Sequence, residues 1–358
     1  MKASDLDRAF VLLEEATLPA VAAAVVTREG VLRSLSRGTA NLETGEALTP
    51  EHAFDLASLT KVLVTLPEVL SLLEGGRLSL QDALSLHLPG AGWAVGGAGE
   101  ANLGSVTIGQ LLTHTSGLPA WAPLYTFPAD HRTLMARVLQ TPLERPPGSA
   151  CVYSDLGFVV LGELVERLNG RVLDVLARER GWVSYHPQGL AVATERCPWR
   201  GRVLQGEVHD ENASALGGVS GHAGAFGTLD DVSRAARAWL RGAVSAATLE
   251  VMTRPWSHEA GGTPRGLGWS LAAPEGFGGG FGGDLASPQG FGHTGFTGTS
   301  LWVEPLRGYA IVLLSNRVHL TRFGSDEIIH LRRRFANAVH AALTPTIHGR
   351  NTCSTPRA

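Results

Sequence analysis

The sequence predicts an α+β protein in which a mostly antiparallel sheet, flanked by helices, is accompanied by a mainly helical subdomain. Two observations predict this class: β-rich runs gather near both ends of the chain, and stretches with apolar residues at helical spacing occupy the middle. With 358 residues, of which 44% are hydrophobic and 18% charged, the chain can bury a large core. We expect residues 1–75 and 160–343 to form the sheet domain, residues 76–159 the helical subdomain, and residues 344–358 a disordered tail.

The N-terminal elements are predicted to be a helix, a hairpin and a second helix. Residues 4–16 have the pattern of an amphipathic helix, and the β-rich runs 20–27 and 31–37 surround an Arg-Glu-Gly turn, which predicts a hairpin. Residues 57–76 then place apolar side chains at helical spacing and end in two glycines. Because Pro67 lies within this stretch, we expect a kink or a join between two helices there.

The middle and the end of the chain continue the alternation of element types. Further helices are predicted at 107–114, 130–140, 156–170 and 230–242. The runs 299–305 and 309–316, separated by a short turn, predict a second hairpin, and a helix is expected over 326–343. The glycine-rich segment 276–283 lacks the Lys-Ser/Thr ending of a phosphate loop, so we interpret it as a flexible loop.

Composition and charge exclude several classes of function. The net charge of -3 and the absence of basic runs give no reason to expect nucleic acid or an anionic membrane as a partner. No stretch of eighteen apolar residues exists, and the N-terminus lacks the pattern of a signal peptide. The three cysteines are scattered, which argues against a disulfide framework. We therefore expect a cytoplasmic protein with no obligatory protein partner, unless a leader was trimmed from this chain.

The stretch ASLTKVLVT contains one of only two lysines, Lys61, among the thirty Lys and Arg residues. Residues three apart share one face of a helix, so Ser58 and Lys61 can touch. Ser-x-x-Lys alone also fits a helix cap followed by a solvated charge. Arginine serves a solvated face equally well, however, whereas a buried lysine can lose its proton and activate a neighbouring serine. The choice of lysine therefore favours chemistry at Ser58.

Two further stretches carry residues suited to the same site. Tyr153, one of four tyrosines, comes directly before the helix predicted from residue 156. His293, Thr294 and Gly295 lie at the edge of the strand predicted near 299–305, where glycine lets a backbone approach a substrate closely.

Together these stretches resemble the three motifs of the serine β-lactamase and penicillin-binding protein superfamily, which are Ser-x-x-Lys, Tyr-x-Asn and Lys-Thr-Gly or His-Thr-Gly. Order and spacing resemble the class C β-lactamase-like branch, which includes D,D-peptidases and esterases. The stretches GRLSLQDALSLHLP, LLTHTSGLP and VHDENASALGGVSGHAGAFGT look like that branch as well. The resemblance covers roughly residues 5–342 and implies a β-lactamase/transpeptidase-like fold.

The resemblance implies a role for each catalytic residue. Ser58 is expected to be the nucleophile that forms an acyl-enzyme, and Tyr153 the general base and then the acid for the leaving group. Lys61 is expected to relay protons and to hold Tyr153 toward its anionic form. The backbone amides of Ser58 and Phe296 are expected to form the oxyanion hole.

The resemblance also implies that the substrate contacts Asp155, His293, Thr294, Gly295 and Phe296. Asp155 stands where these enzymes usually have Asn; an ionised Asp accepts hydrogen bonds but cannot donate one to an amide carbonyl. His293 stands where many have lysine, which reduces the fixed positive charge. These departures favour an esterase or a small-amide hydrolase. The alternatives are a D,D-carboxypeptidase or β-lactamase, and a non-catalytic ligand binder.

Other residues carry weaker signals. The resemblance implies no metal or organic cofactor, and His209, His222 and His258 do not suggest one independently, because they lack the spacing of metal ligands. His114 is interpreted as a structural hydrogen-bonding residue, with a pocket base as the alternative, and Cys151 as buried filler. The glycine-rich loop 217–227 suits tight backbone packing and a pocket wall equally well.

Overall fold

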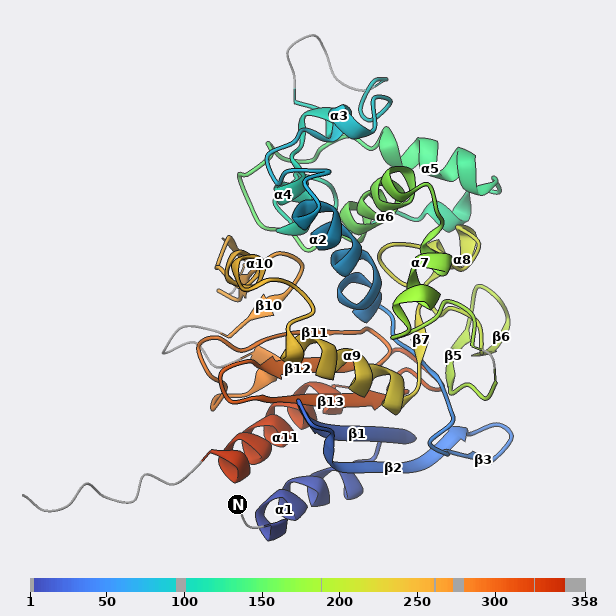
Figure 1. Ribbon diagram of the computed structural model, residues 1–358. Coiled ribbons are helices and arrows are strands. Elements are labelled where there is room, and N and C mark those ends of the chain that lie inside the picture. Colours follow the sequence, from blue (N-terminus) through green and yellow to red (C-terminus); the bar gives the residue numbers. More distant parts are fainter. Residues whose placement is uncertain are drawn as a thin grey trace, which may run out of the picture.

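The computed structural model describes residues 3–94, 101–187, 189–260, 262–272, 280–324 and 326–344. Within these ranges an antiparallel sheet of nine strands lies below a group of helices, with two further helices beneath it (Figure 1). The order of strands across the sheet is β3-β2-β1-β13-β12-β11-β10-β9-β8. The α+β prediction, with a sheet flanked by helices, is confirmed.

The strands of the main sheet are β1 (Ala20–Thr27), β2 (Val31–Asn41), β3 (Glu46–Ala47), β8 (Ser257–His258), β9 (Pro264–Arg265), β10 (Ser270–Leu271), β11 (Phe291–Thr294), β12 (Ser300–Glu304) and β13 (Tyr309–Ser315). Two small ladders pair β4 (Phe54–Asp55) with β7 (Phe226–Gly227) and β5 (Ala193–Cys197) with β6 (Arg202–Gln205). The helices are α1 (Ala3–Glu14), α2 (Leu66–Glu74), α3 (Leu84–His87), α4 (Ile108–Leu112), α5 (His131–Leu139), α6 (Asp155–Asn169), α7 (Leu173–Arg180), α8 (Glu211–Ala215), α9 (Leu229–Arg241), α10 (Ala246–Met252) and α11 (Glu327–Leu343). Shorter turns are the π-helical η1 (Lys61–Thr65) and the 3₁₀-helical η2 (Leu103–Ser105), η3 (Leu124–Thr126) and η4 (Gly280–Gly282).

The two ends of the chain meet in the centre of the sheet. Strand β1 pairs with β13 along its length, so that Val21 lies opposite Ser315 and Thr27 opposite Tyr309. Both predicted hairpins form, β1 with β2 and β12 with β13. The sheet therefore joins elements almost three hundred residues apart, and both the early and the late segments of the site are fixed to it.

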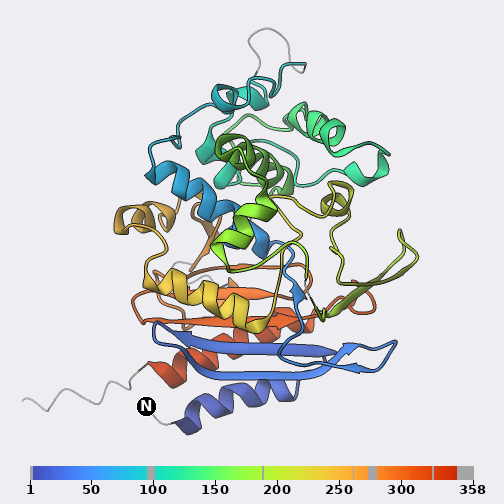
Figure 2. The ribbon, with the colours of Figure 1, turned by 45° about the vertical axis from the view of Figure 1, so that its right-hand side comes forward.

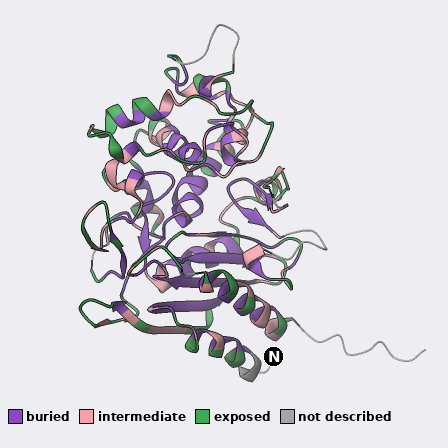
Figure 3. Ribbon diagram, turned by 180° about the vertical axis from the view of Figure 1, so that it is seen from behind, coloured by how far each residue is buried: buried purple, intermediate pink, exposed green. Residues whose placement is uncertain are grey.

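Both faces of the sheet are covered, and alternation along the strands divides the core in two. On β1, Val21, Ala23 and Val25 pack with α1 and α11, whereas Ala22 and Ala24 pack toward α9 and the helical part. Side chains of a strand point alternately to opposite faces, so a strand buried on both faces reads as a continuous apolar run. Figure 3 shows these strands buried, with exposed residues on the outer sides of the lower helices.

The helical part is arranged around α6, which contacts α2, α4, α5 and α7. Figure 2 shows it stacked above the sheet, with the β5–β6 hairpin projecting at one side. The predicted subdomain boundary between residues 159 and 160 falls inside α6, a continuous helix that ends at Gly170 in the left-handed conformation. A boundary after residue 180 keeps this helix and α7 together.

The structure also bears on four smaller expectations from the sequence. The segment with His293 and Thr294 is not at the edge of the strand over 299–305: it is the separate strand β11, which pairs with β12. The stretch around Pro67 does contain a join, because the π-helical η1 gives way to α2 there. Of the glycine-rich segment, residues 276–279 lie outside the described residues, and Gly280 and Gly282 form a turn hydrogen-bonded to α11. The predicted tail also lies outside them, except Thr344.

Candidate active site

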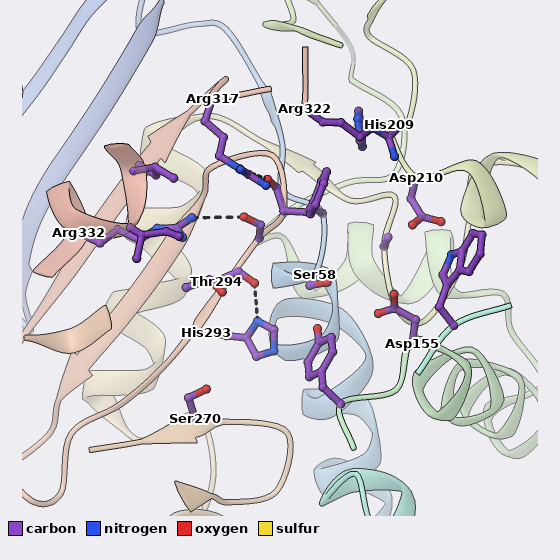
Figure 4. A pocket seen from close by; sticks show the side chains of 18 of the residues that line it. Ser58, Asp155, His209, Asp210, Ser270, His293, Thr294, Arg317, Arg322 and Arg332 are labelled. Carbon is purple, nitrogen blue, oxygen red and sulfur yellow. Dashed lines mark hydrogen bonds between the residues drawn. The ribbon is translucent and has the colours of Figure 1, made fainter. Parts of the chain in front are cut away.

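A pocket of about 710 Å³ opens between β11, the start of η1 and the start of α6 (Figure 4). Of the eight residues singled out by the sequence, seven line it: Ser58, Tyr153, Asp155, His293, Thr294, Gly295 and Phe296. The eighth, Lys61, lies beneath Ser58 and is fully buried. The structure thus brings together three segments that are separated by more than ninety residues each.

Ser58 follows a backbone held in an uncommon conformation. Ala57 has a φ of 46°, in the left-handed region that L residues rarely adopt. The buried Asp55 carboxylate fixes it, because Oδ1 accepts from the Ala57 amide at 2.8 Å and Oδ2 from the His209 amide at 2.6 Å. Strain of this kind persists where surrounding contacts over-determine it, often at functional sites. Nothing in the sequence marked Asp55 for this role.

Lys61 makes three hydrogen bonds, which match the three protons of an ammonium group. Its Nζ donates to Ser58 Oγ at 2.9 Å, to Asp155 Oδ1 at 2.7 Å and to the His222 carbonyl at 3.0 Å. Burial alone would lower the pKa of Lys61, but the charge of Asp155 and the hydroxyl of Tyr153 outweigh it, so the pKa is raised. Lys61 is therefore held as a cation, which does not suit a neutral lysine base.

Asp155 makes a contact that the motif resemblance does not imply. It begins α6 and pairs directly with Lys61, while 22% of its side chain stays exposed at the pocket. Ser154 caps the helix by accepting from the Gly157 amide, which orients the first turn. Asp155 thus lines the pocket and also compensates the buried ammonium.

Tyr153 is surrounded by two cations and two neutral imidazoles. Lys61 Nζ lies 5.0 Å and Arg265 Cζ 5.1 Å from the centre of its ring. The rings of His114 and His293 lie 4.6 and 5.9 Å away. Burial, then the charges of Arg265 and Lys61, keep the pKa values of both histidines well below their usual range. Each cation is also paired with a carboxylate, Lys61 with Asp155 and Arg265 with Glu259, so that charged pairs and not isolated charges surround the phenol.

His114 behaves as a hydrogen-bonding residue of the framework. Its Nδ1 accepts from the Ser154 amide at 3.1 Å, and its carbonyl accepts from the Val152 amide at 2.9 Å. Both bonds fix the segment that carries Tyr153. Cys151 contacts the Thr113 carbonyl and the Ser257 hydroxyl and does not line the pocket.

The end of β11 approaches the Ser58 segment so closely that only glycine fits. A Cβ on Gly295 would lie 2.1 Å from Thr299 Oγ1 and 2.4 Å from the Leu56 carbonyl oxygen. His293 Nδ1 donates to the Thr294 carbonyl at 2.8 Å, which leaves the buried Nε2 as an acceptor without a partner among the described residues. His293 therefore lies beside the pocket as a neutral ring whose Nε2 is buried.

Two backbone amides at the pocket are free. Among the described residues, neither the Ser58 amide nor the Phe296 amide donates a hydrogen bond to a protein group. Both residues line the pocket, and unpaired amides of this kind are the donors from which an oxyanion hole is built.

Three arginines that the sequence did not single out form one side of the pocket: Arg317, Arg322 and Arg332 (Figure 4). Arg322 is paired with Glu195 and Glu211. Arg332 donates to the Gly295 and Thr299 carbonyls, and burial, with the charge of Arg317 beside it, lowers its pKa to about 9. No pattern distinguishes these three among twenty-eight arginines.

The loop 217–227 has both of the structural roles that the sequence left open, tight backbone packing and a pocket wall. A Cβ on Gly221 would lie 2.2 Å from the Phe158 carbonyl oxygen, so the loop packs tightly on α6. His222 pairs with Asp210, its carbonyl accepts from Lys61, and Ala223 lines the pocket. The loop is thus both packed backbone and pocket wall.

The described residues contain no group of three or more His, Cys, Asp or Glu side chains that could hold a metal ion. Nor is any helix within them both long and apolar enough to cross a membrane.

Comparisons with known proteins agree with this architecture. A sequence model of the Beta-lactamase family matches residues 7–333. A putative D-alanyl-D-alanine carboxypeptidase of Escherichia coli (strain K12) is 29% identical over 338 residues, which cover 79% of this chain and 73% of the relative. An N-acetylmuramyl-L-alanine amidase of Bacillus subtilis (strain 168) is 29% identical over 355 residues, 85% of this chain and 78% of the relative. The structure of EstCE1, described as a hydrolase with promiscuous acyltransferase activity, superimposes with a TM-score of 0.71 at 18% identity, covering 93% of this chain and 98% of that one.

The network behind Arg322 generates a prediction about acid stability. Glu195 is 2% exposed; burial alone would raise its pKa, but hydrogen bonds from His209 and Arg322 lower it from 4.5 to about 2. A lowered pKa stabilises the fold above pH 4.5, and this contribution is lost as the pH falls toward 2. In urea titrations, Glu195→Gln should therefore be less stable than wild type at pH 7, and the difference should shrink between pH 4.5 and 3. Glu250→Gln, an exposed site on α10, is the control. A difference that stays constant down to pH 3 would contradict the assignment.

Proposed function

The chain belongs to the Beta-lactamase family, a family of serine hydrolases, and we propose that its own reaction is the hydrolysis of esters or small amides through an acyl-enzyme at Ser58. One observation carries this proposal: a fully buried lysine donates a hydrogen bond to the hydroxyl of a half-buried serine at the floor of a pocket. Burying a charge is costly unless it is paired and hydrogen-bonded. A site that only needed to be stable would not hold an ammonium group against a serine.

The proposed reaction uses Tyr153 as the base. Because Lys61 already carries its proton, it cannot take the one from Ser58; it orients Oγ and keeps positive charge beside Tyr153. The Tyr153 phenolate removes the Ser58 proton as Oγ attacks the substrate carbonyl carbon, and the negative charge moves to the carbonyl oxygen. The amides of Ser58 and Phe296 stabilise that oxygen.

The second half of the reaction reverses the proton movements. Collapse of the intermediate breaks the bond to the leaving group, which takes the proton from Tyr153. Water then attacks the acyl-enzyme, again losing its proton to Tyr153, and the acid is released from Ser58 as Oγ regains a proton. No step requires a metal ion or a cofactor.

Asp155 supports esters as substrates ahead of β-lactams. Its carboxylate is engaged by Lys61, and a carboxylate offers no donor to the carbonyl of an acyl-amide side chain. An ester with a small acyl group does not need such a donor. The exposed part of Asp155 instead accepts hydrogen bonds from the substrate.

The first test is the identity of the nucleophile. After exposure to a fluorophosphonate probe, mass spectrometry should find a single adduct, on the peptide that contains Ser58. This serine has both a cationic neighbour, Lys61, and a free backbone amide at the pocket. Ser58→Ala should abolish the adduct and the hydrolysis of p-nitrophenyl acetate at temperatures well below its melting temperature, which should fall because one proton of the buried Lys61 ammonium loses its acceptor. Labelling that survives in Ser58→Ala would sink the assignment.

The second test concerns the lysine. Lys61→Arg keeps a positive charge, but a planar guanidinium cannot reproduce three bonds made by one nitrogen in a fully buried site. Because Lys61 orients Ser58 Oγ, and misplacing a reacting group costs about 10²-fold, we expect kcat/KM for p-nitrophenyl acetate to fall by about 10²-fold or more. Since Lys61 is fully buried, some loss of stability is also expected, and rates are compared well below the variant's melting temperature. A variant that keeps more than about a tenth of the wild-type rate, well short of that loss, would show that charge alone suffices.

A second candidate function is favoured by two arginines of the pocket. Four carboxylates line it, and each is paired with a cation or an imidazole: Asp155 with Lys61, Asp210 with His222, Glu211 with Arg322, and Glu259 with Arg265. Arg317 and Arg332 line the same pocket without a carboxylate partner among the described residues. A guanidinium without a carboxylate partner suits a substrate with a carboxylate, as in a D,D-carboxypeptidase or a β-lactamase.

The two candidates predict different effects of Arg317→Gln. For an esterase, p-nitrophenyl acetate should be hydrolysed faster than nitrocefin, and the variant should change the ester rate little. For the second candidate, nitrocefin or an acyl-D-Ala-D-Ala peptide should be the better substrate, and loss of a charged hydrogen bond should lower its kcat/KM about tenfold or more. Arg254→Gln, an exposed position after α10, controls for loss of charge alone.

A further inference from the structure

Three aromatic rings continue the pocket onto the surface. Trp121 lines the pocket and is 45% exposed. Its ring centre lies 6.1 Å from that of Tyr125, which lies 5.0 Å from that of Trp199. Trp199 is 62% exposed, on the turn between β5 and β6. The rings come from two segments almost eighty residues apart, so the fold has assembled them.

The segments that carry these rings are fixed by hydrogen bonds. Asn212 on α8 accepts from the Tyr125 amide at 3.2 Å and donates to the Ala122 carbonyl at 2.8 Å. Arg200, the residue after Trp199, donates to three successive carbonyls, those of Val208, His209 and Asp210. The last two of these residues line the pocket, so the aromatic rings are tied to its wall.

Other large aromatic residues are exposed as well, among them Trp93 and Phe323, but neither of these lines the pocket. Trp121 and Trp199 differ from them because they are joined through Tyr125 into one row of rings that begins in the pocket. Adjoining exposed aromatic rings beside a pocket leave apolar area in water, and such patches mark binding sites. Rigid rings lose little conformational entropy when a ligand covers them.

We propose that Trp121, Tyr125 and Trp199 form an extension of the substrate site that binds a flat, weakly polar ring of the substrate, either an aromatic ring or the apolar face of a sugar. Trp121 contacts the ring nearest to the scissile bond, and Tyr125 with Trp199 accepts a second ring. The identity of the substrate rests on the proposed function, but binding of a ring to this extension can be measured without any turnover.

Binding is measured with the Ser58→Ala protein, so that no ligand is consumed. In the first set of probes, benzyl acetate, naphthylmethyl acetate and an acetylated methyl glucoside are each compared with butyl acetate, which has no ring. In the second set, methyl phenylacetate is compared with methyl hexanoate. The two sets place the ring on the leaving-group side and on the acyl side. At least one ring-bearing probe should bind about two- to tenfold more tightly than its ring-free match, the range of one good aromatic contact.

Variants in the Ser58→Ala background locate the preference. Trp121→Ala should abolish it, and Trp199→Ala should weaken binding of the naphthyl probe more than that of the benzyl probe, because only the naphthyl group carries the second ring. Trp93→Ala removes an 86% exposed tryptophan that does not line the pocket and should leave the preference unchanged. A preference shown by the aromatic probes alone assigns an aromatic substrate group, and one shown by the glucoside alone assigns a sugar.

The proposal is overturned if no ring-bearing probe is preferred, or if the preference survives in both Trp121→Ala and Trp199→Ala. Failure of the proposed function is a separate result. If wild-type protein hydrolyses no ester while the ring preference maps to Trp121, the binding site stands and the reaction must be revised. If esters are hydrolysed with no ring preference, the reaction stands and the extension falls.

Discussion

The buried ammonium of Lys61 is the interaction on which the rest of the site depends. A fully buried cation needs a hydrogen-bond acceptor for every proton and a negative charge close by. Here the acceptors come from three parts of the chain: Ser58 one turn earlier, Asp155 at the start of α6, and the carbonyl of His222 in the glycine-rich loop. Satisfying one side chain therefore sets the relative positions of Ser58, the tyrosine segment and one pocket wall.

The same compensation explains why the backbones around Ser58 pack so closely. Gly295 lets β11 approach Leu56 on one side, and Gly221 lets the loop that carries His222 lie against α6 on the other. Hydroxyls complete the contacts, because Thr299 donates to the Leu56 carbonyl at 3.0 Å and Thr65 to the Gly221 carbonyl at 2.7 Å. A catalytic group is most effective when its surroundings hold it before the substrate arrives, and these contacts supply that support.

Residues of a type that is rare in this chain could be predicted from the sequence, whereas residues whose role depends on a partner far away in the sequence could not. Lys61 was identifiable because lysine is so rare in this chain, and the sheet because both ends of the chain have strand patterns. Asp155 was identified as a pocket residue, but its pairing with Lys61 spans 94 positions. Arg317 and Arg332 resemble every other arginine, and Trp199 joins the pocket rim only because the β5–β6 hairpin folds back toward Tyr125.

An Asp in place of the usual Asn at position 155 also changes what the tyrosine motif contributes to the site. An Asn at this position offers the substrate a donor and leaves the lysine without a fixed negative partner. The Asp found here gives up the donor and, against the lowering effect of burial, raises the pKa of Lys61, so that the lysine stays charged. The cations beside the Tyr153 ring are Lys61 and Arg265, and not His293, whose pKa burial lowers. A charge at the third motif is therefore not needed to place cations beside Tyr153, and each of these cations is in turn paired with a carboxylate, Asp155 for Lys61 and Glu259 for Arg265.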